Sequence, residues 1–330
     1  MIGRRQLLVS GAGMASGMLA GRHRKAHAAT QALRIGYILP VASQLGAGAT
    51  VFAQEVAKRT NGRIVIQQYP DATLGGDVEL MKGIQLSSID LAFVTGMGLS
   101  SVLPAAGVLN IPFLFKNNTQ AHAVLDGPIG ESFRKQFIEM NIVMLAWGEN
   151  GLRHVTNARR PIVTPADLQG LRLRVPQSDV LLEGFKALGA DAAPLPFPQL
   201  FEALRAGTFD GQENPIATIV AAKFDQVQKF LTLSGHAYDP AVFLMAPDAF
   251  DDLSHDDRTS FVEAAKLGGA TSRSFAAKAE TEGVAALQRA GMTVQASIDR
   301  DSFVSALAVA NAGYEKTFGL DLIQQIRQTA

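Results

Sequence analysis

The sequence contains no cysteine. Without thiols the chain cannot build a disulfide framework, use a thiol nucleophile or hold a metal through thiolates. It also lacks H-E-x-x-H, G-x-x-x-x-G-K-[ST] and G-x-S-x-G, which mark zinc peptidases, phosphate-binding loops and serine hydrolases. These absences remove the commonest signatures of enzymatic chemistry.

Charge is scarce and balanced. Charged residues make up 18% of the 330 residues, and 30 Lys and Arg face 30 Asp and Glu. A nucleic-acid-binding protein needs an excess of cations on one face, so no nucleic-acid partner is expected. The hydrophobic fraction of 47% excludes wholesale disorder and suits one large or two medium domains.

The first 28 residues have the order of an export signal. They carry five basic residues and no acidic one, and a small, apolar stretch runs from Leu7 to Ala20. Ala26-His27-Ala28 then forms a small-x-small cleavage pattern before Ala29. Arg4-Arg5 with Gln6-Leu7-Leu8 looks like a twin-arginine signal, and an ordinary Sec signal fits equally well. We therefore expect residues 1–28 to be removed and the mature protein to be periplasmic.

The next hundred residues alternate between strand and helix patterns. Apolar runs followed by proline or glycine predict strands, and apolar residues at helical spacing predict helices between them. The resulting β-α-β-α-β order implies a parallel sheet with right-handed crossovers. The expected strands are 33–39, 63–69, 89–94 and 142–147, with helices around residues 51–57 and 77–84.

A similar pattern returns in the second half without a sequence repeat. Strands are expected at 171–175, 226–233, 241–245 and 292–298, and helices at 180–188, 198–206 and 302–328. His255 to Ala290 contains no proline and predicts one very long helix, kinked at Gly268-Gly269, or else two shorter helices. Because no flexible linker separates the halves, we expect two α/β lobes joined by crossing strands, with a ligand cleft between them.

Several polar residues interrupt apolar strands. Arg153 lies between apolar neighbours, and Arg172 and Arg174 share one face of a strand because residues two apart point the same way. Residues 210–215 place polar groups at another strand end. An arginine at the end of a buried strand can bind a carboxylate bidentately, or it can form an internal salt bridge. The four histidines after residue 28 have no ligand spacing, so we expect no metal and no cofactor.

These segments resemble the substrate-binding proteins of TRAP (tripartite ATP-independent periplasmic) transporters, the group that includes the C4-dicarboxylate receptors. The resemblance covers residues 33–330. It rests on FAQEV with TNGRI, LGGD, IPFLF, GLR with TN, LQGLRLRVP, PLPF and DGQENP, which occupy residues 52–56, 60–64, 74–77, 111–115, 151–157, 168–176, 194–197 and 210–215.

The resemblance implies a role for each matching residue. Arg174 matches the arginine that clamps the ligand carboxylate, and Asn214 matches the asparagine that assists it. Arg153 matches a second cleft arginine, Phe197 an aromatic residue packed on the ligand, and Gln177 a polar contact. Arg172 is interpreted as an exposed or salt-bridged neighbour of the clamp.

Asn150 lies after a hinge strand and is expected to reach the cleft. Residues 94–96 offer no acidic side chain, although Thr95 supplies a hydroxyl, and residues 41–44 lack the histidine of many relatives. These departures favour a smaller or more apolar acid over a strongly hydroxylated sugar acid.

The resemblance implies a two-lobed fold like that of periplasmic binding proteins, with a long bracing helix. We expect lobe I to comprise residues 29–150 and 239–279, and lobe II residues 151–238 and 280–330. The expected function is a periplasmic receptor, a monomer without enzymatic activity, that closes on a small organic acid and delivers it to the membrane permease of a TRAP transporter. The alternatives are an exported enzyme acting on an organic acid and a receptor that feeds a sensor.

Overall fold

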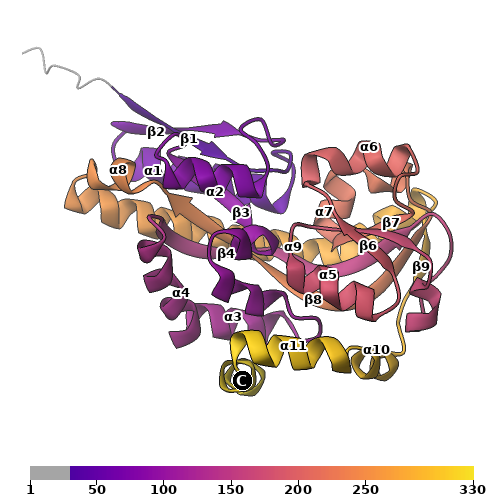
Figure 1. Ribbon diagram of the computed structural model, residues 1–330. Helices are drawn as coiled ribbons and strands as arrows, with labels where there is room; N and C mark the ends of the chain where they lie inside the picture. Colours follow the sequence, from indigo (N-terminus) through magenta and orange to yellow (C-terminus); the bar gives the residue numbers. More distant parts are fainter. Residues whose placement is uncertain (1–29) are drawn as a thin grey trace, which may run out of the picture.

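The structure, a computed structural model, describes residues 30–330, and the predicted export signal lies outside them. One mixed sheet runs through the molecule in the strand order β2-β1-β3-β8-β4-β7-β5-β6, and β9 pairs with β8 (Figure 1). The strands are β1 (Gln31–Gly36), β2 (Ile64–Tyr69), β3 (Leu91–Thr95), β4 (Val143–Asn157), β5 (Arg172–Val175), β6 (Asp191–Pro194), β7 (Gly211–Pro215), β8 (Phe230–Met245) and β9 (Thr293–Gln295).

Two long antiparallel strands, β4 and β8, join the halves of this sheet. β3 pairs with one end of β8, and β7 pairs with the opposite end of β4. The predicted two-lobed α/β fold with crossing strands is therefore confirmed. Two strand predictions were wrong here: β8 was expected as two strands, 226–233 and 241–245, and β4 only as its first part, 142–147, because glycine and proline interrupt the apolar pattern. Here register shifts between Glu149 and Gly151 and between Arg153 and Val155 absorb the irregularity instead.

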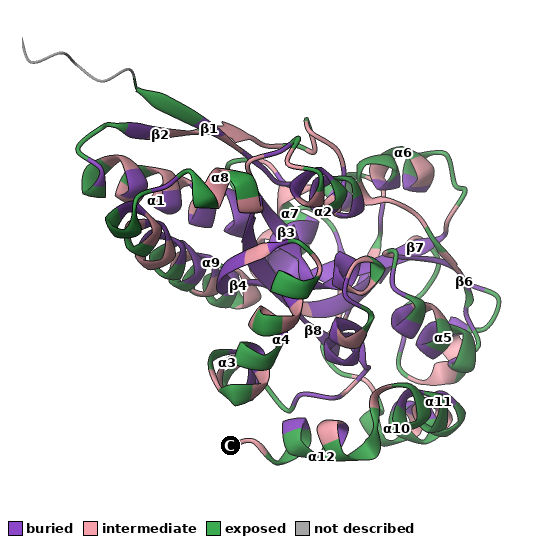
Figure 2. Cartoon of the chain, turned by 60° about the vertical axis from the view of Figure 1, so that its left-hand side comes forward, coloured by how far each residue is buried: buried purple, intermediate pink, exposed green. Residues whose placement is uncertain are grey.

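Helices cover both faces of the sheet, and Figure 2 shows β3, β4 and β8 buried between them. Short 3-10 turns connect several elements: η1 (Gly96–Ser101), η2 (Pro104–Asn110), η3 (Pro165–Leu168), η4 (Phe197–Gln199) and η5 (Phe224–Gln226). The α-helices are α1 (Gln44–Arg59), α2 (Asp77–Gln85), α3 (Asn118–Asp126), α4 (Pro128–Glu139), α5 (Asp179–Ala187), α6 (Leu200–Arg205), α7 (Ile216–Ala221), α8 (Pro247–Asp251), α9 (His255–Arg289), α10 (Arg300–Ala306), α11 (Ala308–Phe318) and α12 (Leu320–Gln328).

Helix α9 is a single helix of 35 residues, as one of the two sequence interpretations predicted. It packs against α1, β4 and α7, and so braces both lobes. Gly268 and Gly269 do not interrupt the helix. They allow it to lie close to α1 and β4. A Cβ on Gly269 would lie 2.1 Å from the carbonyl oxygen of Trp147, and one on Gly268 would lie 2.7 Å from that of Gly48.

The C-terminal helices contact both α5 and α3. The Tyr314 hydroxyl donates to the Val180 carbonyl in α5 at 2.7 Å. The Gln120 amide of α3 donates to the carbonyls of Arg327 and Thr329, at 3.0 and 2.8 Å. The segment expected as one helix with a break near Gly319 forms three helices, since the chain also turns at Leu307. Among the helices of residues 30–330, none is both long and apolar enough to cross a bilayer.

The close packing of α9 on β4 predicts a sharp difference between two glycines. Gly269→Ala places a methyl group against a backbone oxygen that cannot move independently, so we expect a loss of about 1–3 kcal/mol in the free energy of unfolding. Gly313→Ala in α11 meets no atom within 4 Å and should stabilise the fold by about 0.5–1 kcal/mol. Urea unfolding of both variants checks this, and equal effects would contradict the packing assignment.

Candidate functional site

A cavity lies between the lobes, at the ends of several strands. All seven residues predicted as ligand-binding line it: Thr95, Asn150, Arg153, Arg174, Gln177, Phe197 and Asn214. The lobes touch around it. A Cβ on Gly76 would lie 3.7 Å from Cδ of Pro198 across the mouth, and Asn110 donates to Ser178 at 3.0 Å. The structure therefore shows the cleft closed.

Local sequence explains how these side chains reach the cavity. Arg174 is the third of the four residues of β5, and Pro176 follows, where its missing N–H and fixed φ end the strand. Asn214 lies near the end of β7, and Thr95 is the last residue of β3. Strand ends in open α/β sheets collect ligand-binding groups at such an edge.

Arg174 is buried without a carboxylate partner. Its side chain and backbone together are 2% exposed. Its Nε and Nη2 both donate to the Leu195 carbonyl oxygen, at 2.8 and 2.6 Å, and no Asp or Glu of residues 30–330 lies within ion-pair distance. Desolvation lowers the pKa of Arg174 to about 9, which still leaves it charged at pH 7. A buried cation in this state favours binding of an anion.

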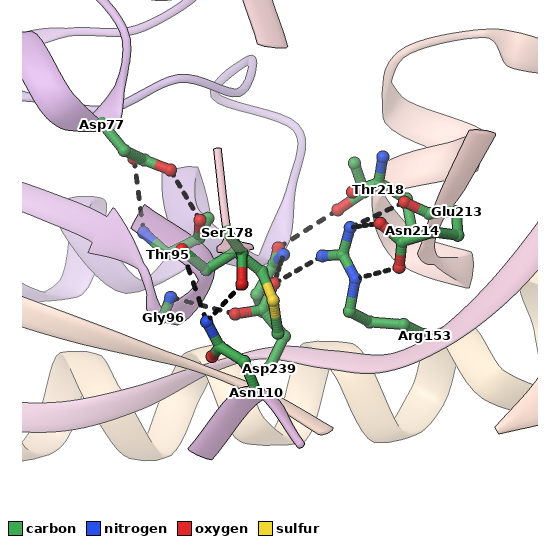
Figure 3. A network of polar contacts seen from close by, with 12 residues as sticks. Asp77, Thr95, Gly96, Asn110, Arg153, Ser178, Glu213, Asn214, Thr218 and Asp239 are labelled. Carbon is green, nitrogen blue, oxygen red and sulfur yellow. Dashed lines mark hydrogen bonds and ion pairs between the residues drawn. The ribbon is translucent and has the colours of Figure 1, made fainter. Parts of the chain in front are cut away.

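Arg153, by contrast, is neutralised within the protein. Its Nε pairs with Glu213 at 2.6 Å, and its Nη1 pairs with Asp239 at 2.6 Å (Figure 3). Both carboxylates are fully buried. Desolvation opposes the charge on Arg153, but the two carboxylates outweigh it and raise its pKa. Arg153 lines the cavity as predicted, yet most of its donors are committed to protein oxygens.

The buried groups around Arg153 differ in their protonation equilibria. Desolvation disfavours the Glu213 anion, but Arg153 and His236 overcome this and lower its pKa to about 2. Desolvation dominates at Asp239 and raises its pKa to about 6. Desolvation also lowers the pKa of His236, whose Nε2 lies 2.9 Å from Glu213. Asp239 further accepts the Gly96 N–H at 2.9 Å, so the cluster reaches the first lobe.

Asp77 is an acidic residue of the cavity that the sequence analysis missed. Its carboxylate accepts the Thr95 hydroxyl at 2.5 Å and the Thr95 N–H at 3.3 Å (Figure 3). Desolvation raises the pKa of Asp77 to about 7. Asp77 is the last residue of the LGGD motif, at the expected start of a helix, and this position was the sequence signal that could have identified it as a cavity residue. The expectation of no acid near Thr95 considered neighbours in sequence, whereas Asp77 arrives from another element.

The remaining predicted residues occupy different depths. Asn214 is buried, and its Nδ2 donates to Gln212 at 2.5 Å, which orients the amide. Gln177 is exposed at the mouth, and Phe197 is partly buried with its ring 6.2 Å from that of Phe224. Arg172, whose side chain is half-exposed, pairs with the buried Asp210 at 2.8 Å, as interpreted from the sequence. Across residues 30–330 no group of His, Asp or Glu side chains is placed to hold a metal ion.

The buried pairs of Arg153 predict a strong effect on stability. Arg153→Met leaves two carboxylates buried without a cation, which typically costs about 3–5 kcal/mol. Because those carboxylates can be protonated in acid, the deficit relative to wild type should shrink from pH 8 to pH 5. Arg172→Met removes a half-exposed cation from the buried Asp210, which keeps its pair with Arg159 at 2.9 Å, so the loss should be smaller, about 1 kcal/mol. Denaturant unfolding at both pH values is the measurement, and a deficit independent of pH would refute the explanation.

Comparisons with known proteins agree with this geometry. The family "Bacterial extracellular solute-binding protein, family 7" matches residues 35–317. A solute-binding protein from Verminephrobacter eiseniae is 42% identical over 300 residues, covering 91% of this chain and 90% of that protein.

Two solved structures are also similar. A TRAP periplasmic solute-binding protein from Polaromonas, bound to D-erythronate, has a TM-score of 0.89 and 40% identity, covering 91% of this chain and 99% of the other. One from Bordetella bronchispeptica, with density interpreted as pantoate, has a TM-score of 0.89 and 39% identity, covering 91% and 100%. The chain belongs to family 7 of the bacterial extracellular solute-binding proteins, the receptors of TRAP transporters.

Proposed function

We propose that this protein is a periplasmic receptor that captures a small organic acid by closure of its two lobes and delivers it to the membrane permease of a TRAP transporter. The observation that carries the proposal is the buried Arg174, whose charge has no carboxylate partner among residues 30–330. Its family consists of solute-binding proteins, which favours this role over an exported enzyme.

Closure of the cleft explains why the ligand carboxylate should bind to Arg174. A carboxylate that enters it loses water and must gain charge-assisted hydrogen bonds in exchange. Arg174 offers a planar guanidinium held from one side by the Leu195 carbonyl, so its remaining donors are pre-oriented. Asn214 assists at the carboxylate, and Phe197 packs against the ligand body. Gln177 closes the mouth.

The distal end of the ligand meets the first lobe. Asp77 is fixed by two hydrogen bonds from Thr95, and it lines the same cavity as Arg174. Two carboxylates brought together repel one another unless a donor lies between them. We therefore propose a short acid that bears a hydroxyl group, which donates to Asp77. This revises the preference for an apolar acid, and it agrees with the erythronate and pantoate described for the similar structures.

Asn150 and Arg153 form the cavity floor at the hinge strand β4 and couple the site to Asp239. The lobes comprise residues 29–150 with 239–279 and residues 151–238 with 280–330, and the receptor acts as a monomer. α12 is bonded to α3 across this division, so it spans both lobes.

Substitution of Arg174 tests the clamp. A broken charge pair in a closed site costs about 2–5 kcal/mol, roughly 30-fold or more in affinity. We expect Arg174→Ala to lose at least this much affinity for D-erythronate, and Arg174→Lys somewhat less because it keeps the charge without the fork. Titration calorimetry measures both, with Arg172→Ala as the matched control that should bind as wild type does. Binding by Arg174→Ala within about twofold of wild type would refute the clamp.

A second substitution tests the hydroxyl contact. Above the raised pKa of about 7, for example at pH 8.5, Asp77→Asn replaces an anionic acceptor, so affinity for D-erythronate should fall about 10-fold or more, the loss expected for a hydrogen bond to a charged group. Butyrate has the same chain length and no hydroxyl, and its weaker binding should be unchanged or improved. Competition titrations with each acid give the factor by which Asp77→Asn changes the affinity for D-erythronate and for butyrate. Equal losses for the two acids would show that Asp77 does not recognise a hydroxyl.

A further inference from the structure

A triangle of buried side chains joins the two lobes behind the cavity. Nε2 of Gln44, the first residue of α1, donates to Asn150 Oδ1 at 2.5 Å and to Thr218 Oγ1 at 2.9 Å. Thr218 Oγ1 donates to Asn150 Oδ1 at 3.1 Å. All three residues are at most 2% exposed. Asn150 and Thr218 line the cavity, whereas Gln44 lies outside its lining.

The three corners belong to parts of the molecule that closure brings together. Gln44 begins α1, which packs on β2 and α9 in the first lobe. Thr218 is in α7, directly after the strand that carries Asn214 in the second lobe. Asn150 lies between them on β4, at a register shift beside Gly151, whose φ of +134° suits glycine.

The Gln44 amide bonds through its nitrogen alone. Nε2 also reaches the Asn150 carbonyl at 3.1 Å, while the buried Oε1 has no partner among the described residues. Turning the amide over would point its oxygen at two acceptor oxygens of Asn150, so the observed orientation is the favourable one. The nitrogen contacts between lobes must offset the cost of the unpaired oxygen.

We propose that Gln44 is a positioning residue that holds the closed lobes together without touching the ligand. This rests on the proposed capture of an acid by lobe closure. Opening separates α1 from α7 and breaks the Gln44–Thr218 bond in a buried place, where water does not immediately replace it. The contact therefore stabilises the closed state and slows release of the bound acid.

The first test replaces Gln44 and Thr218, the two residues whose bond joins the lobes, with apolar side chains of similar shape. Gln44→Met and Thr218→Val should each weaken D-erythronate binding about 10-fold, mainly through faster dissociation in stopped-flow traces. The double variant should lose less than the product of the two losses, because both remove one contact. Gln85→Met is the control: it removes a half-buried amide-to-carbonyl bond, to Met140, within the first lobe. It should lower stability without changing dissociation.

The second test follows closure itself. Because the chain has no cysteine, the substitutions Leu86→Cys and Ala206→Cys allow spin labels to be attached at one exposed site in each lobe. Pulsed dipolar spectroscopy should show a smaller short-distance population for Gln44→Met than for wild type, at the same D-erythronate concentration. Unchanged distances and unchanged dissociation would overturn the proposal.

The two proposals fail differently. If D-erythronate does not bind wild-type protein, the ligand assignment fails, and Gln44 is then judged on the ligand-free distance distribution. In the absence of ligand, the short distances that mark closed lobes must be present in wild type, and their population must be smaller in Gln44→Met. Its absence from wild type under both conditions would also contradict the proposal.

Discussion

The site depends on one constraint: the guanidinium of Arg174 is buried and has no counter-ion within the part of the chain that the structure describes. Withdrawing a charge from water is costly, and proteins normally repay that cost with a partner of opposite charge. The cavity contains two arginines that meet this requirement differently. Arg153 is held by Glu213 and Asp239, whereas Arg174 has one backbone carbonyl. The first arginine is part of the framework, and the second is ready for an anion supplied from outside.

The strands and the helix around these arginines suit a site that opens and closes. β4 and β8 pass through both lobes, and their pairing shifts register next to the cavity. The polar cluster of Figure 3 lies at the same place, where it links Gly96 of the first lobe through Asp239 to Arg153. Helix α9 packs along both lobes, and its glycines let it approach β4 closely. The irregular points of the strands and the ligand-facing residues therefore coincide, so binding and lobe closure act on the same residues.

Much of this architecture could be predicted from local patterns. Strand and helix periodicity located most elements, and the polar residues within apolar strands pointed to Arg153, Arg174 and Asn214, which the structure brings to one cavity. Sequence failed where the explanation is three-dimensional. The long strands were predicted too short because glycines that tolerate a bulge interrupt their apolar pattern. The internal pairing of Arg153 needs acids 60 and 86 residues away. Asp77 was missed because its contact with Thr95 joins separate elements.

The most direct measurement is a crystal structure of the protein with D-erythronate bound. The account predicts that both carboxylate oxygens lie about 2.7–2.9 Å from the guanidinium nitrogens of Arg174. It also predicts that a hydroxyl lies within hydrogen-bond distance of Asp77, and that Arg153 keeps its pairs with Glu213 and Asp239. A carboxylate bound elsewhere in the cleft, with Arg174 still bonded to the Leu195 carbonyl alone, would contradict the account.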